Sequence, residues 1–276
     1  MFSAPYFTGA LELEVLGGVN FMTFDPDRKT AYSGDEEFKA VFFPVGKIAV
    51  SGDLSGSMSF NVTAARDNIL LNSLSFSLYN RTDNFRFEFG PFIGMGDDLE
   101  VPNIGITGSI EITFPGIAFL SFGGMATLGS VFDFTSADSR ESAEAKVGFW
   151  LPNIILSGCA DTRSLTRHPR DNLEIRDTLT RFFVSADFFI KNIPVTARLD
   201  AGYEIYTREY KGEGSGTTDQ LSTFFTGIDV GWQVTKPLRI TANFEIPFLP
   251  TAAGAMKLPD FWSIFKATAG IVYTFF

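Results

Sequence analysis

The last fourteen residues of the chain, SIFKATAGIVYTFF at positions 263–276, alternate in character from one residue to the next. One parity carries Phe265, Ala267, Ala269, Ile271, Tyr273 and Phe275, and the other carries Lys266, Thr268, Gly270, Val272 and Thr274. A period of two places the two sets on opposite faces of a β-strand. A terminal strand without a neighbour leaves a row of unpaired backbone groups. Pairing it with the first strand of the chain would satisfy both strands and close a barrel.

Residues 268–275, TAGIVYTF, carry a polar residue, a glycine two positions later and two aromatic residues near the end. This pattern resembles the C-terminal insertion signal of bacterial outer-membrane β-barrels. In that family the barrel-assembly machinery reads the final strand, which pairs with the first. The resemblance implies an insertion signal made of Gly270, Tyr273, Phe275 and Phe276. It also implies a lipid bilayer and the assembly machinery as partners, in the outer membrane of a Gram-negative-type bacterium.

The composition agrees with a membrane barrel and with no other membrane protein. The chain has 276 residues, of which 45% are hydrophobic, yet no apolar run approaches the roughly 18 residues of a membrane helix. Membrane residence therefore requires strands, whose apolar residues occupy every second position. The 31 Phe suit a lipid-facing surface with aromatic girdles, and the 26 Gly suit bends and close strand contacts.

Charge and cysteine content exclude several functions. The net charge of −10 argues against nucleic acid as a partner, because its phosphates require Lys and Arg. The single cysteine, Cys159, excludes an internal disulfide and provides no metal cluster. We therefore expect neither a metal nor a cofactor. The acidic segment 25–37 could offer carboxylates to calcium, but its spacing does not match a calcium loop and a solvated loop is the better interpretation.

Alternation continues along the whole chain and predicts fourteen strands, although the pattern leaves twelve or sixteen open. Leu74, Phe76 and Leu78, for example, alternate with serines. Short connections are expected on one side, centred on Pro44, Thr82, Pro115, Pro152, Ile193 and Lys236. The other connections are mostly longer and polar. The predicted fold is all-β, a closed antiparallel transmembrane β-barrel with short periplasmic turns and longer outer loops, and residues 1–276 form a single domain without a plug domain.

Three segments receive specific predictions. Residues 38–43 are expected to form a short strand that ends in a turn at residues 44–46. Residues 47–65 keep one parity and are expected to form one long strand. Residues 165–177 are expected to form a charged loop, and residues 212–220 a flexible one.

A soluble β-sandwich is the main alternative fold, since alternation alone does not reveal whether apolar faces meet lipid or a protein core. Fourteen strands supply more apolar face than one soluble core needs. The polar faces mix charge with Ser, Thr and Gly rather than the Lys and Glu of a solvated surface. Both features favour the membrane barrel.

Ionisable residues fall on the parity opposite to the apolar one and are predicted to face the lumen. The predicted pore-lining residues are Glu12, Glu14, Arg86, Glu88, Glu111, Glu144, Lys146, Arg181, Asp187, Arg198, Asp200, Glu204, Asp229, Arg239, Glu245 and Lys266. So many charges cannot occupy a dry interior unpaired, because each would cost several kcal/mol. Either water fills the lumen or the charges pair across it.

The predicted function is a porin-like outer-membrane channel for passive diffusion of small hydrophilic solutes or ions. Fourteen strands lie near the open end of the range of barrel sizes, and no connection is long enough to be a large stopper. The excess of carboxylates predicts a mild cation preference. In size the chain resembles the small monomeric fourteen-stranded porins, which implies a monomer.

Three other functions stay open. Inward aromatic residues (Phe43, Trp150, Phe183, Phe189 and Phe225) keep a transporter of hydrophobic compounds in view, which would resemble the fatty-acid transporters. A structural barrel or adhesin is a further alternative. An outer-membrane hydrolase would depend on His168, with Ser164 and Asp171 near it in sequence, but we expect no enzyme because a surface histidine explains the residue equally well.

Overall fold

The computed structural model describes residues 11–20, 43–55, 58–67, 69–82, 84–95, 102–130, 138–170, 173–189, 193–212, 216–254 and 265–275. Fourteen β-strands lie in these ranges. They are β1 (Leu11–Asn20), β2 (Phe43–Ser55), β3 (Met58–Asp67), β4 (Leu71–Arg81), β5 (Phe85–Met95), β6 (Asn103–Phe114), β7 (Ala118–Ser130), β8 (Ser139–Leu151), β9 (Ile154–Arg170), β10 (Leu173–Phe189), β11 (Val195–Gly212), β12 (Thr217–Gln233), β13 (Leu238–Ala253) and β14 (Lys266–Phe275). Within the described residues, no helix is long and apolar enough to cross a membrane.

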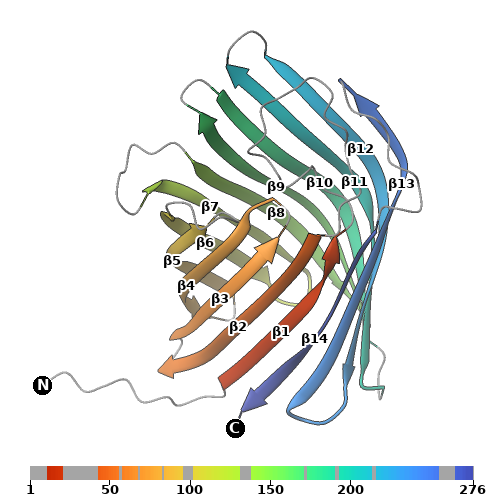
Figure 1. Cartoon of the computed structure of the whole chain (residues 1–276). Helices are drawn as coiled ribbons and strands as arrows, with labels where there is room; N and C mark the ends of the chain where they lie inside the picture. The colour runs from red at the N-terminus through yellow and green to blue at the C-terminus, as the bar shows by residue number, and fades with distance from the viewer. Residues whose placement is uncertain are drawn as a thin grey trace, which may run out of the picture.

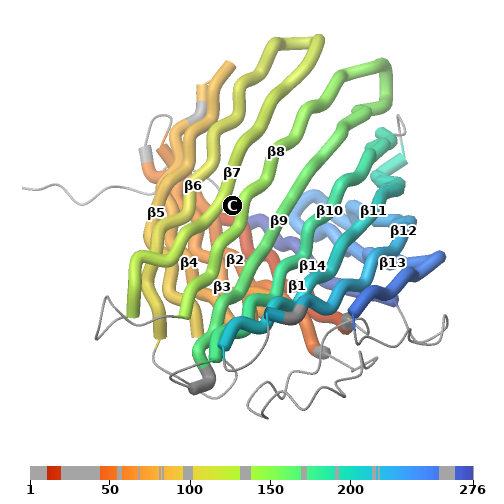
Figure 2. The backbone as a smooth tube through the Cα atoms, turned by 90° about the horizontal axis from the view of Figure 1, so that it is seen from above, coloured from red at the N-terminus to blue at the C-terminus, as the bar shows by residue number. Residues whose placement is uncertain are grey.

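The strands form one closed antiparallel barrel in which each strand pairs with its neighbours in sequence (Figure 1). β14 closes the barrel against β1, with Leu11 opposite Phe275 and Asn20 opposite Lys266. Seen from above, the strands follow one another in chain order around the interior (Figure 2). The predicted fold class, the strand number and the closure by the terminal strand are confirmed.

The strand boundaries near the N-terminus differ from the prediction. Residues 44–46 lie inside β2, and the segment predicted as one long strand over residues 47–65 is divided between β2 and β3. The parity could not reveal this division, because Leu54 before the connection and Met58 after it share the same outward parity. Pro44 is tolerated in the second position of β2, where a missing N–H costs little. The predicted strand over residues 38–43 lies almost wholly outside the described residues.

The predicted charged loop over residues 165–177 was also wrong, since β9 continues to Arg170 and β10 begins at Leu173. β12 likewise begins at Thr217, inside the segment expected to be a flexible loop. In these parts both faces of the strands carry polar residues, so the contrast between faces that predicts a strand is lost. Polarity on both faces is expected where a strand extends beyond the hydrocarbon layer.

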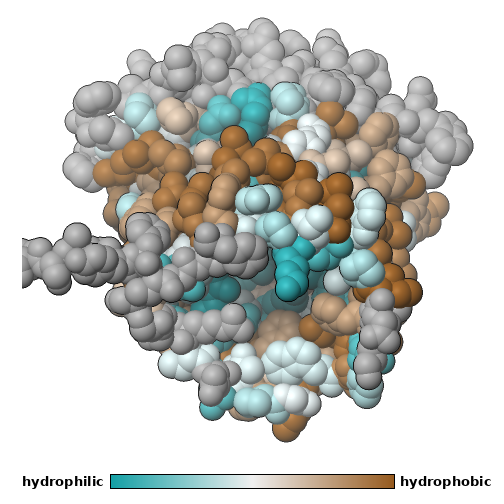
Figure 3. All heavy atoms as spheres, turned by 90° about the horizontal axis from the view of Figure 1, so that it is seen from below, coloured by the Kyte–Doolittle hydropathy of each residue, from teal (hydrophilic) through white to brown (hydrophobic). Residues whose placement is uncertain are grey.

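The outer surface of the barrel is an apolar belt. Over much of the barrel, large exposed hydrophobics recur at every second residue of a strand, for example Phe85, Phe87 and Phe89 of β5 and Phe182 and Val184 of β10. Seen from below, apolar residues cover outer parts of the molecule, and hydrophilic residues gather in the hollow between them (Figure 3). A soluble sandwich would bury these side chains, so the alternative fold is excluded. The chain is a transmembrane β-barrel of the outer-membrane type.

The barrel wall is uneven in height. β9 to β12 are 17 or 18 residues long, whereas β1 to β5 are 10 to 13. In Figure 1 the long strands reach well past the short ones at the end opposite the chain termini. The outward face of this extension is polar: Thr162 and Ser164 of β9 share hydroxyl hydrogen bonds with Thr180 and Thr178 of β10. The low wall therefore faces a tall wall whose upper part lies beyond the hydrocarbon.

Candidate functional site

All sixteen residues predicted to line a pore lie on the inward parity of their strands. The register places them beside one another: Arg181 lies opposite Glu204, and Arg198 lies opposite both Asp187 and Asp229. The outward residues between them belong to the apolar belt. The structure therefore gathers these charges inside the barrel, and their role in conduction stays a prediction.

Several of these charges form pairs along the wall. The Lys47 ammonium donates to the Glu14 carboxylate at 2.5 Å. Arg198 donates two hydrogen bonds to Asp187, from Nε at 2.5 Å and from Nη2 at 3.2 Å. Their exposed fractions of 40% and 41% leave both cations in contact with water. Such pairs orient the side chains while contributing little to stability.

A nearly buried charge cluster is centred on Arg181 of β10. Its Nη2 donates to Glu245 of β13 at 2.6 Å, and its Nε lies 3.4 Å from the Glu204 carboxylate of β11. The guanidinium carbon lies 4.2 Å from the centre of the Phe225 ring and 5.4 Å from that of Phe183. All three side chains are nearly buried, and one guanidinium lies within 4 Å of both carboxylates.

The short connection between β3 and β4 places apolar side chains inside the barrel. Ile69, Leu70 and Leu71 are buried, although a turn at the rim of a barrel is normally exposed. Ile69 and Leu70 form a cluster with residues of the opposite wall, namely Leu179 of β10, Tyr206 of β11 and Leu221 of β12. Leu71 packs on Leu165 of β9. We call this cluster of seven residues the apolar bridge, because it joins the low wall to the tall wall across the lumen.

Polar contacts stabilise the turn of the apolar bridge. The Asp67 carboxylate accepts the backbone N–H groups of Ile69 and Leu70 at 2.8 and 2.5 Å, and it pairs with Arg163 of β9 at 3.2 Å. Arg140 of β8 donates from Nε to the Leu70 carbonyl at 2.8 Å. Gly94 makes room for Arg140, since a Cβ there would lie 2.7 Å from its Cδ. The turn is thus held by an ion pair to Arg163 of β9 and by a hydrogen bond from Arg140 of β8.

The apolar bridge places a short connection inside the lumen, where the sequence predicted no stopper. A short connection is enough to enter the lumen, because the three-residue turn between the short strands β3 and β4 packs against the longer strands β9 to β12. Leu71 adopts the left-handed φ of 59°, which costs a bulky residue of order 1–3 kcal/mol and must be offset by its packing.

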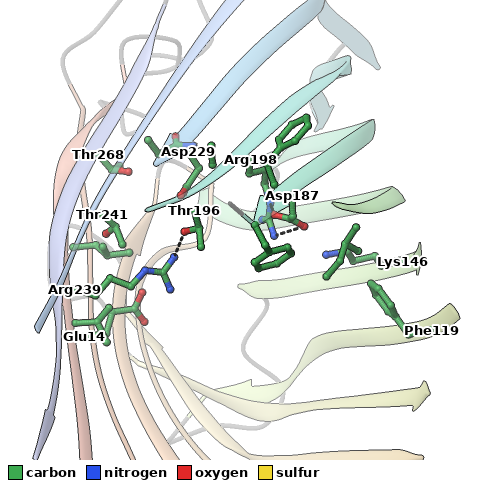
Figure 4. Close-up of a pocket in the computed structure, with 17 residues that line it drawn as sticks. Glu14, Phe119, Lys146, Asp187, Thr196, Arg198, Asp229, Arg239, Thr241 and Thr268 are labelled. Atoms are coloured by element: carbon green, nitrogen blue, oxygen red, sulfur yellow. Dashed lines mark hydrogen bonds and ion pairs between the residues drawn. The ribbon is translucent and has the colours of Figure 1, made fainter. Parts of the chain in front are cut away.

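Two cavities of the interior are lined by many of the charges described above. The first has a volume of about 490 Å³ and is lined by residues of β1 and of β7 to β14. Lys146 and Phe119 lie on one side of this cavity, and Arg239 and Glu14 lie on the opposite side (Figure 4). The Arg239 guanidinium donates to Thr196 at 3.2 Å. The second has a volume of about 380 Å³ and is lined by Glu88, Glu111, Glu144 and Asp161 with two arginines. Both cavities are lined by ionisable groups, as the sequence predicted for the lumen.

The inward aromatic residues do not form a continuous apolar path. Phe183 and Phe225 cover the Arg181 guanidinium, and Trp150 packs on Phe119 with ring centres 5.4 Å apart. Phe189 borders the first cavity among charged residues. The side chain of Phe43 lies outside the described residues. These contacts give no support to transport of hydrophobic compounds.

His168 lies in β9, on the outward face of the extension, and not in a loop. Its Nδ1 is 3.7 Å from Asp138 and its Nε2 is 3.6 Å from Glu174. Ser164 is four residues earlier in the same strand, roughly 13 Å away at the usual rise of a strand. Its hydroxyl is already bonded to Thr178. Asp171 lies outside the described residues. Ser164 is therefore not placed to act as a nucleophile with His168.

We predict that His168→Ala leaves every transport property of the folded barrel unchanged. Two carboxylates flank the imidazole on the outer surface, and the lumen lies on the other side of the wall. Single-channel recording and an ester hydrolysis assay check this. Measurable hydrolysis by the wild-type chain that disappears in the variant would contradict it and favour the hydrolase.

The predicted insertion signal has a structural role in β14. A Cβ at Gly270 would lie 2.0 Å from the Val15 carbonyl oxygen, so only glycine permits the close contact with β1. The rings of Tyr273 and Phe275 lie on the outward face with centres 4.7 Å apart. Phe276 lies outside the described residues. Recognition by the assembly machinery stays a prediction.

Among the described residues, no group of three or more His, Cys, Asp or Glu is placed to hold a metal ion. The acidic segment 25–37 lies outside those residues. Cys159 of β9 faces the interior as a free thiol.

Comparison with known proteins gives similarity of structure only. No family model and no curated protein matches the chain. An outer-membrane channel from Pseudomonas putida F1 is 10% identical, with a TM-score of 0.48 and full coverage of both chains. OmpT, an outer-membrane protein of Vibrio cholerae, is 11% identical, with a TM-score of 0.47 over 100% of this chain and 99% of that one. The NanC porin is 7% identical, with a TM-score of 0.46 over 96% and 99%.

These similarities are weak in sequence and in overall superposition. The assignment as an outer-membrane type barrel therefore rests on the strand pairing, the apolar belt and the charged interior of the chain itself.

Proposed function

We propose that the protein is an outer-membrane channel for passive diffusion of small hydrophilic solutes or ions, narrowed at one level by the apolar bridge. The observation that carries the proposal is the enclosure of two cavities with ionisable walls inside a lipid-facing barrel. Charges such as Glu111, Glu144 and Lys146 make no ion pair with other described residues. Unpaired charges require water, so the interior is wet.

A mild cation preference belongs to this proposal. The sixteen inward residues comprise ten carboxylates and six cations, which leaves four surplus negative charges. Carboxylates along a pathway favour cations. The channel is proposed to work as a monomer, with the bilayer and the barrel-assembly machinery as its partners.

We predict stable single-channel steps of small amplitude when the purified barrel is reconstituted in planar bilayers. In a potassium chloride gradient, the reversal potential should take the sign that indicates K⁺ as the more permeant ion. A reversal potential that indicates a preference for chloride would contradict the proposed cation preference, but not the proposed channel.

A correctly folded barrel that stays silent, even after the apolar bridge is removed, would contradict the channel itself. That result would favour a structural or adhesive barrel, because the outer surface would then be the remaining candidate for function.

A further inference from the structure

The two cavities differ in their charge balance once ion pairs are set aside. In the first cavity, Arg198 is paired with Asp187, and Glu14 is paired with Lys47. The lining charges that remain are Lys146, Arg239 and Asp229, with one positive charge in surplus. The cavity thus reverses the sign of a chain whose net charge is −10.

The second cavity keeps a surplus of negative charge. Arg86 lies 3.3 Å from Glu88, and Arg163 lies 3.6 Å from Asp161. The lining charges left without such a partner are Glu111 and Glu144. This cavity is therefore suited to a cationic group.

The cavities meet along β8, where unpaired charges of opposite sign stand side by side. Glu144 lines the second cavity and Lys146 lines the first. They occupy the same face of the strand two residues apart, at about 6.6 Å between Cα atoms. Neither side chain makes a hydrogen bond or ion pair with another described residue, and the Lys146 ammonium lies 5.5 Å from the centre of the Phe119 ring.

Polar groups with spare hydrogen-bonding capacity line the first cavity on the wall opposite Lys146 (Figure 4). The Thr241 hydroxyl is buried and has no hydrogen-bond partner among the described residues. The Arg239 guanidinium makes one hydrogen bond, to Thr196, of the five that its N–H groups allow. The donors of that wall are satisfied by water, whereas a carboxylate would satisfy the Lys146 ammonium and an ammonium group would satisfy Glu144.

We propose that the lumen binds a zwitterionic solute, such as an amino acid or a short peptide, across the junction of the two cavities. Its carboxylate lies toward Lys146, and its ammonium group lies toward Glu144. The inference rests on the proposed function, since a ligand of the interior is then a solute of the channel. It is compatible with a cation preference for simple salts, because that preference reflects the sum of all lumen charges.

Three probes with the same four-carbon chain test the proposal: 4-aminobutyrate carries both charges, butyrate carries the carboxylate, and butylammonium carries the ammonium group. Calorimetric titration of the folded full-length barrel in detergent should give 4-aminobutyrate a dissociation constant about fivefold lower than either other probe. Such a ratio is typical of one additional solvent-accessible charge contact. Because this titration requires no conduction, it can succeed or fail independently of the bilayer recording.

Matched variants test which side chain binds the carboxylate of the ligand and which binds its ammonium group. Lys146→Gln should weaken 4-aminobutyrate to the level of butylammonium, and Glu144→Gln should weaken it to the level of butyrate. Lys236→Gln, in the turn after β12, and Glu209→Gln, on the outward face of β11, are the same substitutions outside the lumen and should have no effect. Equal affinities for the three wild-type titrations, or butyrate binding as tightly as 4-aminobutyrate, would overturn the proposal.

Discussion

Replacing both Ile69 and Leu70 with serine should raise the single-channel conductance several-fold. Each buried aliphatic side chain contributes about 2–5 kcal/mol through its packing, and serine removes that contribution while introducing a hydroxyl that favours water. The turn would then leave Leu179, Tyr206 and Leu221 and open the lumen at the level of the apolar bridge. Planar bilayer recording measures the change, and heat stability of the folded band shows that the barrel remains closed.

The matched control keeps volume and polarity. Ile69→Val combined with Leu70→Met preserves an apolar turn and should leave conductance near the wild-type value, because volume-conserving substitutions usually cost less than about 1.5 kcal/mol. A serine variant that folds with unchanged conductance would show that the bridge does not obstruct the pathway. In that case the described cavities would connect around it.

The parity of the chain predicted which residues face lipid and which face the interior, because the period of a strand is two wherever one face meets hydrocarbon. Phe85, Phe87 and Phe89 are exposed as expected, and Arg86 and Glu88 point inward. The terminal strand also predicted its own partner, since an unpaired edge in a membrane is costly.

The apolar bridge could not be derived from the sequence, because it depends on the relative heights of two distant walls. One signal was available. Leu71 shares the inward parity of β4 with Ser73, Ser75 and Ser77. Leu165, Leu179 and Leu221 likewise lie on inward parities that also carry charged residues. Four inward leucines in a polar lumen indicate a contact within it. Their mutual proximity still requires the register of all fourteen strands.

The position of charges within the lumen was predicted by sequence, whereas their pairing was not. Arg163 and Asp67 are separated by 96 residues and meet across the barrel, and Arg181 and Glu245 are separated by 64. Alternation determines the face of a strand and carries no information on which side chain on another strand lies within 4 Å. The division into paired and unpaired charges, on which the proposed ligand depends, therefore follows only from the structure.

Arg181→Ala should destabilise the barrel far more than the loss of a water-accessible charge of the lumen. Glu204 and Glu245 share the Arg181 guanidinium and are nearly buried, so its loss leaves two neighbouring carboxylates without the cation that contacts both. Breaking a buried ion pair in this way typically costs 3–5 kcal/mol. Urea unfolding in lipid vesicles, followed by tryptophan fluorescence, should show a decrease of about this size.

Arg198→Ala is the control, because it removes an arginine whose side chain is 41% exposed and whose partner Asp187 can be hydrated. Its expected loss is below about 1 kcal/mol. The variant that combines Arg181→Met, Glu204→Gln and Glu245→Gln removes all three charges and should recover most of the stability lost in Arg181→Ala, since buried ion pairs can often be replaced by neutral residues at little cost. Equal losses for Arg181→Ala and Arg198→Ala, or no recovery in the combined variant, would mean that packing of Arg181 against Phe183 and Phe225, rather than compensation of charge, stabilises this level of the barrel.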